Sequence, residues 1–427
     1  MKAEEKPKRL DLSKIPRDNP DDVLEVIQSM AGEGVVVQRG QDLEGRMDLR
    51  RSSGIVTLDI GCKGGLPAGG LSQIDGLDGV GKNLVLNHYY ARCQRAYGDD
   101  CNIGMVCFES AYDKMFGRQC GVKVALSDYE IDIEDRKRKD AGLPGLTKKE
   151  KDTLATDQIG RFHLVRGNIA ERMLQVVADM TATNAYQIIG IDSWDAMLPS
   201  AADAKDLEDS AKVADASNVQ TRWMSKVFGA LTPQKICPEC GNRPLEFKST
   251  GPAKYSYTCK SCNWRGKTPY MWENETTLIG IRQVRANMNK VNMRSREYKV
   301  GGSYALRHGK MLDIQLRKGE YIMKDKTQIG KEVKWEITKG KAGTHEGIDG
   351  SFSYYFDPPR IDISSDLLSY ALPNGIITSG GSYTFQDRVL CKKKEQLIGI
   401  LNGDGKLRAA VRKAVLSHAG LGYVRYR

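Results

Sequence analysis

The 427-residue sequence has no long hydrophobic run. A membrane-spanning helix needs about 20 consecutive apolar residues, so we expect no transmembrane segment. The first 20 residues contain three prolines and many charges but no apolar stretch of the kind that secretory signal peptides carry. We therefore expect a cytoplasmic protein. Histidines number only five and are scattered, so we expect no histidine-based metal centre.

Charge and cysteine usage narrow the class of protein. Lys and Arg total 65 against 54 Asp and Glu, a net charge of +11, which favours a polyanionic partner. Hydrophobic residues make up 40% of the chain, enough for a sizeable core, which excludes a fully disordered protein. Four of the ten cysteines form two tight pairs and six are single. This division excludes a secreted disulfide scaffold and indicates one metal site plus buried thiols.

Alternating strand and helix patterns predict an open α/β fold. Apolar runs predict strands at residues 71–76, 102–109 and 186–193, and helical periodicity predicts helices at 83–95 and 169–181. Buried strands separated by helices are typical of an open, mostly parallel sheet. A helix over 21–30 and a strand over 34–38 precede this region. Two insertions interrupt it, one highly charged (128–157) and one carrying the paired cysteines (234–272). Residues 388–418 are predicted to be a basic helical segment.

A phosphate-binding loop stands between the first strand and the first helix of the predicted sheet. The sequence GLDGVGKN at 76–83 fits the pattern G-x-x-x-x-G-K in the strand–loop–helix context that this motif requires. Its glycines let backbone N–H groups surround phosphate oxygens, and Lys82 would reach the terminal phosphates of ATP. The nucleotide-binding candidates of this loop are Gly76, Asp78, Gly79, Val80, Gly81, Lys82 and Asn83. Asn83 stands where a Ser or Thr usually binds Mg²⁺; an amide oxygen also coordinates this ion.

Two carboxylates end predicted strands and supply the acidic groups that ATP hydrolysis requires. Asp192 follows the apolar run QIIGI, where a phosphate-loop ATPase presents the acid that organises Mg²⁺. Glu109 ends the run NIGMVCF, at the sheet edge where α/β proteins bind ligands, and is placed to polarise an attacking water. For both carboxylates, the alternatives are a helix-capping acid or a solvated loop acid.

Several ordered segments resemble the RecA/UvsX-type recombinase family. The similarity covers residues 21–127, 160–233 and 273–415. The segments that carry it are SSGIVTLDIGCKGGLPAGGLSQIDGLDGVGK (52–82), FESAYDKMFGRQCGV (108–122), IIGIDSWDAMLP (188–199), TRWMSKV (221–227), IGIRQVRANMNK (279–290), ITKGKAG (337–343) and DLLSYALPNGIITSGGSYTF (366–385). The resemblance implies a RecA-like core with a small C-terminal α/β domain. It also implies that the N-terminal helix and strand dock on the next subunit of a filament.

The resemblance assigns roles to individual residues of the nucleotide site. By this likeness Glu109 is the base that activates water, and Asp113 and Phe116 contact the adenine. Gln283 would sense the γ-phosphate and couple it to DNA. Two lysines, Lys339 and Lys341, would reach the ATP of the neighbouring subunit. The catalytic set is then Glu109, Lys82 and Gln283, and Asn83 and Asp192 hold Mg²⁺.

The resemblance also implies two DNA-binding segments, the second of which closes at Gly301 and Gly302. Between Gln283 and Gly301 the sequence is rich in basic and amide side chains with one acid, which suits binding of a sugar-phosphate backbone without base specificity. An exposed basic loop is the alternative. The DNA-binding candidates are Arg222, Arg285, Asn287, Lys290, Arg294, Arg296, Gly301 and Gly302.

The cysteine insertion has the spacing of a zinc ribbon. Two C-x-x-C pairs, Cys237/Cys240 and Cys259/Cys262, are separated by eighteen residues. Each pair directs two thiolates toward one point, and two pairs complete a tetrahedral Zn²⁺ site. A dithiol redox pair is the alternative. The insertion carries seven basic residues together with the aromatic residues Tyr255, Tyr257 and Trp264, a surface suited to DNA; bracing of the fold and contact with a protein partner stay open. The family's usual members lack an insertion here.

We divide the chain into residues 1–52, an ATPase core over 53–363 and a C-terminal domain over 364–427. The favoured function is an ATP-dependent recombinase that polymerises on single-stranded DNA and exchanges strands with duplex DNA, with ATP, Mg²⁺ and Zn²⁺ as cofactors. Its partners would be both forms of DNA and further copies of itself, with single-strand-binding and loader proteins as candidates. The alternatives are an ATP-binding DNA filament protein with little turnover, a helicase-like motor and a zinc-bearing repair ATPase.

Overall fold

The structure is a computed structural model that describes residues 49–109, 112–203, 214–232, 234–241, 245–251, 254–267, 270–286, 298–299, 303–341, 343–422 and 424. The described residues fall into two compact units. One consists of Ser225–Glu275, and the other of the described residues before and after it. The helix and strand predicted at 21–30 and 34–38 lie outside the described residues.

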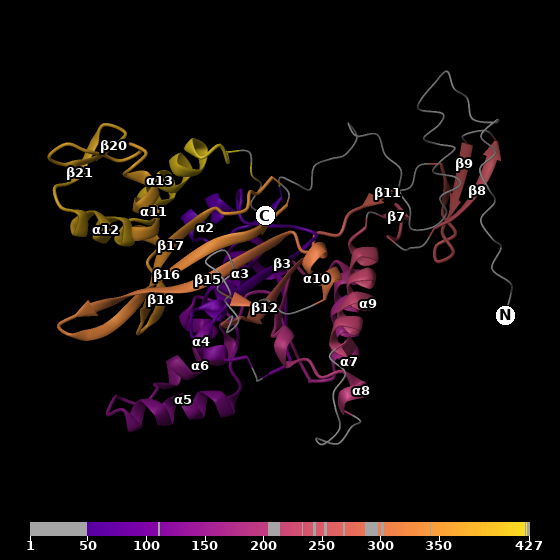
Figure 1. The fold of residues 1–427 in the computed structure, drawn as a ribbon, viewed down its shortest axis with the longest axis horizontal. Helices are drawn as coiled ribbons and strands as arrows, with labels where there is room; N and C mark the ends of the chain where they lie inside the picture. The colour runs from indigo at the N-terminus through magenta and orange to yellow at the C-terminus, as the bar shows by residue number, and fades with distance from the viewer. Residues whose placement is uncertain are drawn as a thin grey trace. The chain divides into compact units, whose positions relative to one another are not determined.

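A nine-stranded sheet forms the centre of the larger unit (Figure 1). The strand order is β18-β17-β16-β15-β3-β12-β6-β4-β5. The strands from β15 to β5 pair in parallel, whereas β15 to β18 pair with one another antiparallel. The bounds are β3 Leu71–Gly76, β4 Asn102–Cys107, β5 Arg161–Arg166, β6 Ile188–Asp192, β12 Thr277–Gln283, β15 Leu312–Lys324, β16 Thr327–Gly340, β17 Asp349–Phe356 and β18 Pro359–Ile361. The predicted α/β fold with a mostly parallel sheet is confirmed.

The parallel register brings the ends of four strands to one edge of the sheet. Gly76 at the end of β3 pairs with Gln283 at the end of β12, and Cys107 of β4 pairs with Asp192 of β6. The central strands are buried almost completely, as their continuous apolar runs require. Any residue that follows these strands therefore lies at the same edge.

Helices and short strands complete the core. In α7 the apolar residues Met173, Leu174 and Val177 share one face at helical spacing and are buried. The helices are α2 Val56–Gly61, α3 Lys82–Tyr97, α4 Lys114–Gln119, α7 Ala170–Thr183, α8 Ser200–Asp203, α9 Ala214–Leu231 and α10 Tyr304–Gly309, with two 3-10 turns, η4 Gly98–Asp100 and η5 Trp194–Ala196. The larger unit also contains short strands. β1 Arg50–Arg51 pairs with β2 Leu66–Pro67, and β13 Arg285–Ala286 follows β12. In the described part of the chain, no helix is long and apolar enough to cross a membrane.

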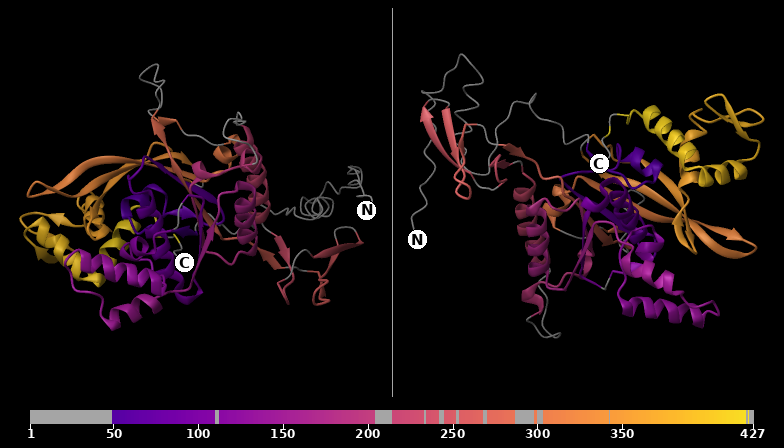
Figure 2. Two further views of the ribbon diagram at one scale, coloured as in Figure 1. Left: turned by 90° about the horizontal axis from the view of Figure 1, so that it is seen from below. Right: turned by 180° about the vertical axis from the view of Figure 1, so that it is seen from behind.

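The charged insertion forms a pair of helices, α5 Asp128–Asp140 and α6 Lys148–Thr156 (Figure 2). Each begins with a capping box, formed by Ser127 with Glu130 and by Thr147 with Glu150, which satisfies the free N–H groups of the first turn. Asp135 of α5 forms ion pairs with Lys139 and with Lys151 of α6. Capping and charge pairs thus give order to a segment with few apolar residues.

The C-terminal region corrects one prediction. Residues 388–418 are not one helical segment, because Arg388–Cys391 forms strand β21 and two separate helices follow it. Asp404 caps the second helix by accepting a hydrogen bond from the Leu407 N–H, and this cap separates the two helices. The region comprises α11 Ile363–Ala371, a sheet of β19 Thr378–Ser379, β20 Tyr383–Phe385 and β21, then α12 Lys394–Gly403 and α13 Gly405–His418. Their apolar core also includes Val56 of α2.

The smaller unit contains the cysteine insertion. Its two ends meet where β7 Gln234–Ile236 pairs antiparallel with β11 Tyr270–Trp272. Between them, β8 Glu246–Gly251, β9 Lys254–Thr258 and β10 Arg265–Gly266 form a three-stranded antiparallel sheet. Its small apolar core contains Leu245, Tyr257 and two of the four paired cysteines.

Candidate nucleotide site and metal centre

The predicted phosphate loop connects β3 to α3. Gly79 and Gly81 adopt positive φ angles of 65° and 115°, which a residue with a side chain rarely adopts. The loop can therefore turn its backbone N–H groups inward in front of the first turn of α3. Lys82 begins this helix and folds its ammonium group back onto the loop, with Nζ 2.9 Å from the Gly76 carbonyl and 3.0 Å from that of Leu77. Burial lowers the pKa of Lys82, and the carboxylates around it, first of all Asp78, counteract this effect.

Asn83 and Asp192 are joined by a direct contact. The Asn83 amide donates a hydrogen bond of 3.1 Å to Oδ2 of Asp192. Burial raises the pKa of Asp192, and the hydrogen bond from Asn83 acts in the opposite direction. The two residues predicted to hold Mg²⁺ thus lie side by side, and an amide and a carboxylate are oxygen donors of the kind that this ion prefers.

Glu109 lies at the same edge of the sheet. It follows β4, and the N–H of the preceding Phe108 donates to the Asp192 carbonyl at 2.7 Å. The Ser193 hydroxyl donates a hydrogen bond to Oε1 of Glu109. The peptide bond between Asp192 and Ser193 is cis. The structure therefore brings together Lys82, Asn83, Asp192 and Glu109, although they come from three different strand ends.

Gln283 connects the phosphate loop to a neighbouring turn. Its side-chain amide donates to Oδ1 of Asp78 at 2.6 Å, and its backbone N–H donates to Oδ2 of Asp195 at 2.8 Å. Asp78 belongs to the phosphate loop and Asp195 to the turn η5 after β6. Just beyond Gln283, β13 Arg285–Ala286 pairs with β14 Tyr298–Lys299. Gln283 thus links the loop to the base of a hairpin.

Sequence reasoning missed Lys331. This buried residue of β16 donates a hydrogen bond to the carbonyl of Gly79 in the phosphate loop. Its ammonium group also lies 5.5 Å from the ring centroid of Tyr354, and burial lowers its pKa. Lys331 is 252 residues from Gly79 in the chain, so no local motif marks it. The available signal was the alternation of β16, in which Lys331 shares the buried face with Val333, Trp335 and Ile337.

The two residues predicted at the adenine lie on the first turn of α4. Asp113 caps this helix, and its side chain accepts a hydrogen bond of 2.9 Å from the Phe116 N–H. Phe116 is half-buried and packs on the main core. The two residues are neighbours at the start of α4, and their contact with a base stays a prediction.

Lys339 and Lys341 lie at the end of β16 and both contact α10 of their own chain. Lys339 donates to the Arg307 carbonyl, and Lys341 donates to the His308 carbonyl at 2.6 Å. Cations are favoured at the C-terminal end of a helix, where carbonyl groups lack partners. Burial lowers the pKa of Lys339, and Lys341 beside it acts in the same direction.

The DNA-binding candidates are only partly described. Arg222 is exposed on α9, and the backbone of Arg285 forms part of β13. Asn287, Lys290, Arg294, Arg296, Gly301 and Gly302 lie outside the described residues. They flank or fall within the segment whose base is the β13–β14 pair.

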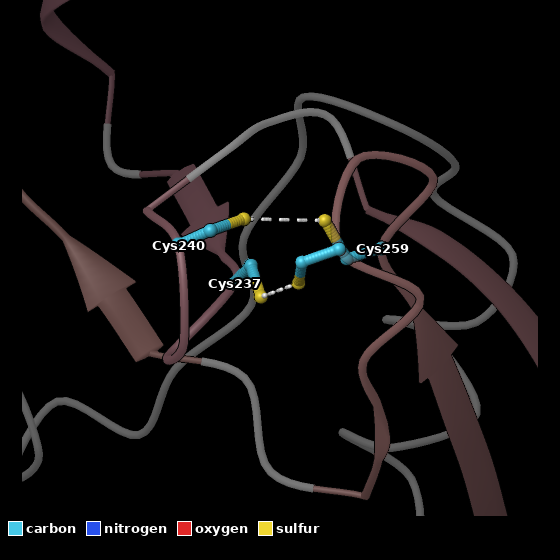
Figure 3. Close-up of side chains that lie close together, drawn as sticks. Cys237, Cys240 and Cys259 are labelled. Atoms are coloured by element: carbon cyan, nitrogen blue, oxygen red, sulfur yellow. Dashed lines mark hydrogen bonds between the residues drawn. The ribbon is translucent and has the colours of Figure 1, made fainter.

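The four paired cysteines converge in the smaller unit. All four Sγ atoms lie within 4.8 Å of one another. The Sγ atoms of Cys240 and Cys259 are 3.5 Å apart, as are those of Cys237 and Cys262, and Figure 3 shows Cys240 and Cys259 facing each other. Tetrahedral Zn²⁺ with Zn–S bonds of about 2.3 Å requires sulfur atoms about 3.8 Å apart. The cluster therefore fits zinc.

Backbone geometry supports the same conclusion about the cysteine cluster. Gly241 follows the first pair with a φ of 69°, and its N–H donates to the Cys237 carbonyl at 2.9 Å, which forms a tight turn. The Cys262 N–H lowers the pKa of the Cys259 thiol to about 6. None of the ten cysteines forms a disulfide, and five of the six single ones are buried, as expected for small apolar side chains.

The fold and the loop define a class of protein. A glycine loop between a parallel strand and a helix, with carboxylates after the neighbouring strands, is the arrangement of a phosphate-loop nucleotide-binding protein, here with a RecA-like core.

Comparison with known proteins makes this class more specific. The chain is 22% identical over 408 residues to "Protein RecA" of Oleidesulfovibrio alaskensis. The matched region covers 95% of this chain and 92% of that protein. It is 20% identical over 407 residues to "Protein RecA" of Campylobacter jejuni (95% and 94%) and 21% identical over 386 residues to that of Helicobacter pylori (90% and 87%). No protein-family model matches the chain. The resemblance to RecA-type recombinases is confirmed, and the chain is a divergent relative.

Proposed function

We propose that this protein is an ATP-dependent DNA recombinase that assembles on single-stranded DNA and exchanges strands with homologous duplex DNA. The observation that carries the proposal is the convergence of Lys82, Asn83, Asp192 and Glu109 at one edge of the sheet, next to a glycine loop. Similarity to proteins named RecA over 95% of the chain supports the same function.

Each residue of the site has a chemical task in ATP hydrolysis. The N–H groups of residues 77–82 would hold the phosphates, and Lys82 would leave the loop carbonyls to bind the terminal phosphates. Asn83 and Asp192 would hold Mg²⁺, which would supply positive charge against the negative charge that develops on the phosphates. Glu109 would orient and deprotonate the attacking water, with its carboxylate held in place by the Ser193 hydroxyl.

Two further contacts suit a nucleotide-dependent DNA switch. Gln283 donates to Asp78 of the phosphate loop and stands two residues before the β13–β14 hairpin, so a phosphate that recruits its amide would also move the base of the DNA segment. Lys339 and Lys341 would release the α10 carbonyls and reach ATP on an adjacent subunit, where a cation stabilises the transition state.

The cysteine insertion is proposed to bind one Zn²⁺ through its four thiolates. The small core around the cluster holds only three further apolar residues in the described part of the unit, so metal binding would supply most of its folding energy. Its basic and aromatic residues, among them Lys235 beside Tyr257, favour a contact with DNA.

The first test measures ATP hydrolysis by the zinc-loaded full chain with and without single-stranded DNA. We expect DNA to stimulate turnover and the Glu109→Gln variant to lose at least 100-fold, about the contribution of a general base. The Glu320→Gln variant, which changes an exposed carboxylate of β15, should match the parent. Absence of both ATP binding and DNA binding would exclude the proposed function.

The contact between Asn83 and Asp192 favours a second candidate, a filament protein that binds ATP with little turnover. If the Asn83 amide stays on Asp192 when ATP is bound, Mg²⁺ loses a ligand. ATP-dependent DNA binding without hydrolysis would support this candidate. An Asn83→Ser variant that gains turnover would locate the cause in this residue.

A further inference from the structure

A cavity of about 900 Å³ lies between the core helix α3 and the C-terminal helices, all within the larger unit. Five arginines line it, from three parts of the chain, and we call it the arginine cavity. They are Arg92 and Arg95 of α3, Arg360 of β18, and Arg408 and Arg412 of α13. Among its described lining residues the one carboxylate is Asp362. The phosphate loop contributes no residue to this lining.

Two described carboxylates, Asp59 and Asp362, lie near these five arginines. Asp59 pairs with Arg412 at 3.2 Å, so this arginine is neutralised. Asp362 caps α11 by accepting hydrogen bonds of 3.0 Å from the Ser365 N–H and 2.7 Å from its hydroxyl. Arg408 donates to the carbonyl of Leu401 at 3.2 Å, a neutral partner. The wall of the cavity therefore carries an excess of positive charge.

One of the five arginines, Arg360, is restrained by an aromatic ring. The Arg360 guanidinium lies over the ring of Tyr355, 4.9 Å from its centroid, and cation–π contact restricts the side chain. His88 shares α3 with two of the arginines and lines the same cavity. Burial, followed by Arg95 and Arg92, lowers the pKa of His88 to about 4. Burial is thus the main cause of the lowered pKa of His88, and the two arginines add to it.

The size and lining of the cavity define a ligand. Pockets for small organic molecules measure about 300–1,000 Å³. Guanidinium groups recognise phosphate oxygens with two parallel hydrogen bonds. The first residue of α13, Gly405, lines the cavity as well, and so do the apolar residues Leu367 and Ile398. Several phosphates would meet the arginines, and an organic body would meet the apolar wall.

We propose that the arginine cavity binds a compact polyphosphate group, and that the bound ligand fastens the C-terminal helices to α3. The source is either inorganic polyphosphate or a nucleoside polyphosphate, which share this chemistry. The site is separate from the phosphate loop and depends on neither ATP hydrolysis nor DNA binding.

The test uses the zinc-loaded full chain with Lys82→Ala, which removes the lysine of the phosphate loop. Calorimetric titration with inorganic tripolyphosphate should show one binding event per chain, tighter than that of sulfate. Adding Arg360→Gln and Arg408→Gln should weaken binding at least tenfold. A matched pair, Arg136→Gln and Arg388→Gln, removes two exposed arginines outside the cavity and should leave binding unchanged. If both double variants lose tripolyphosphate affinity equally, or if the Lys82→Ala parent does not bind tripolyphosphate, the proposal is overturned.

A second measurement leaves the five arginines of the cavity unchanged. Tripolyphosphate bound beside His88 should raise the pKa of this imidazole, which NMR can follow because the chain has only five histidines; a His88→Gln variant assigns the signal. An unchanged His88 titration at saturating ligand contradicts binding at this place, even if the arginine variants fold poorly.

Two further arms identify the source of the ligand. ATP that binds the Lys82→Ala chain more tightly than tripolyphosphate indicates an organic body against Leu367 and Ile398, and equal affinities indicate that the phosphates alone are recognised. In either case, the Arg360→Gln and Arg408→Gln substitutions must weaken binding of both ligands if they occupy the cavity. A short DNA duplex that displaces tripolyphosphate at equal phosphate concentration would instead assign the surface to nucleic acid and overturn the proposal.

Discussion

The side-chain amide of Gln283 donates a hydrogen bond of 2.6 Å to the Asp78 carboxylate. One residue ends β12 and the other belongs to the phosphate loop, 205 positions earlier in the chain. This bond connects the loop directly to the strand that leads to the β13–β14 hairpin. In the proposed function, this contact couples nucleotide binding at the loop to the position of the DNA-binding segment.

Replacing Gln283 with Glu should disrupt this connection. The new carboxylate would face Asp78 at hydrogen-bonding distance, and two like charges repel. We expect DNA stimulation of ATP hydrolysis to fall at least tenfold while nucleotide binding persists. The Asp78→Asn variant keeps an acceptor oxygen for the Gln283 amide and keeps the amide that a phosphate would recruit, so it should retain most of the stimulation. A loss in Asp78→Asn as large as that in Gln283→Glu would contradict the role of this contact in coupling.

A buried ionic network lies directly before the phosphate loop. Asp75 of β3 pairs in register with Arg282 of β12, and Gln73 donates to Asp75 and accepts 2.9 Å from Arg282. Burial, followed by repulsion from Asp313, raises the pKa of Asp75 to about 7. An ordinary Asp has a pKa of about 3.9, so the folded chain keeps a proton that the unfolded chain releases between these pH values.

This difference predicts a pH-dependent stability. The free energy of unfolding should decrease from about pH 4 to pH 7, by at most about 1.4 kcal/mol per pH unit for one such group. Asp366, whose pKa burial also raises to about 7, adds to the same slope. Asp75→Asn should reduce the slope in urea unfolding at pH 5, 6 and 7. Asp325→Asn, in an exposed turn, is the control, and identical slopes in all three proteins would contradict the assignment.

Patterning predicted three strands of the sheet, β3, β4 and β6, of which β4 and β6 are short apolar runs next to turn residues. It did not predict β5 or the antiparallel strands β16 to β18. The convergence of Glu109 and Asp192 followed from parallel strands ending at one edge. The contact of Lys331 with Gly79 did not follow, because it depends on the pairing of β15 with both β3 and β16.

Two other features show where a local pattern is insufficient. Asp75 and Arg282 are charged residues inside buried strands, but only the register of β3 and β12 shows that they are neighbours. The break in 388–418 was missed because its basic residues fit a helix, whereas pairing with β20 and the Asp404 cap decide the outcome.

Asp366 fastens the C-terminal helices to the core. From α11 it accepts hydrogen bonds of 2.5 Å from the Val56 N–H and the Thr57 hydroxyl, at the start of α2. Asp366→Ala would leave these buried donors without a partner, at a cost of about 1–3 kcal/mol. Hydrogen exchange should then accelerate in both α2 and α11.

A matched variant separates docking from local helix stability. Asp404→Ala removes the cap of α13, which costs about 0.5–2 kcal/mol, but Asp404 has no described bond to α2. Exchange should accelerate in α13 and stay unchanged in α2. If Asp366→Ala also leaves α2 protected, the carboxylate does not hold the two regions together.

The cysteine cluster predicts one zinc ion per chain. Elemental analysis should find one equivalent in the parent, and Cys237→Ser with Cys259→Ser should abolish it, because these buried thiols supply one ligand from each pair. Cys391→Ser changes a half-buried thiol outside the cluster and should keep the zinc.

Since the metal would supply the folding energy of the ribbon, chelation should make residues 234–272 sensitive to protease while the larger unit stays resistant. If DNA affinity falls after chelation but ATP binding does not, the ribbon contacts DNA; full zinc content in the double variant would exclude the four-thiolate site.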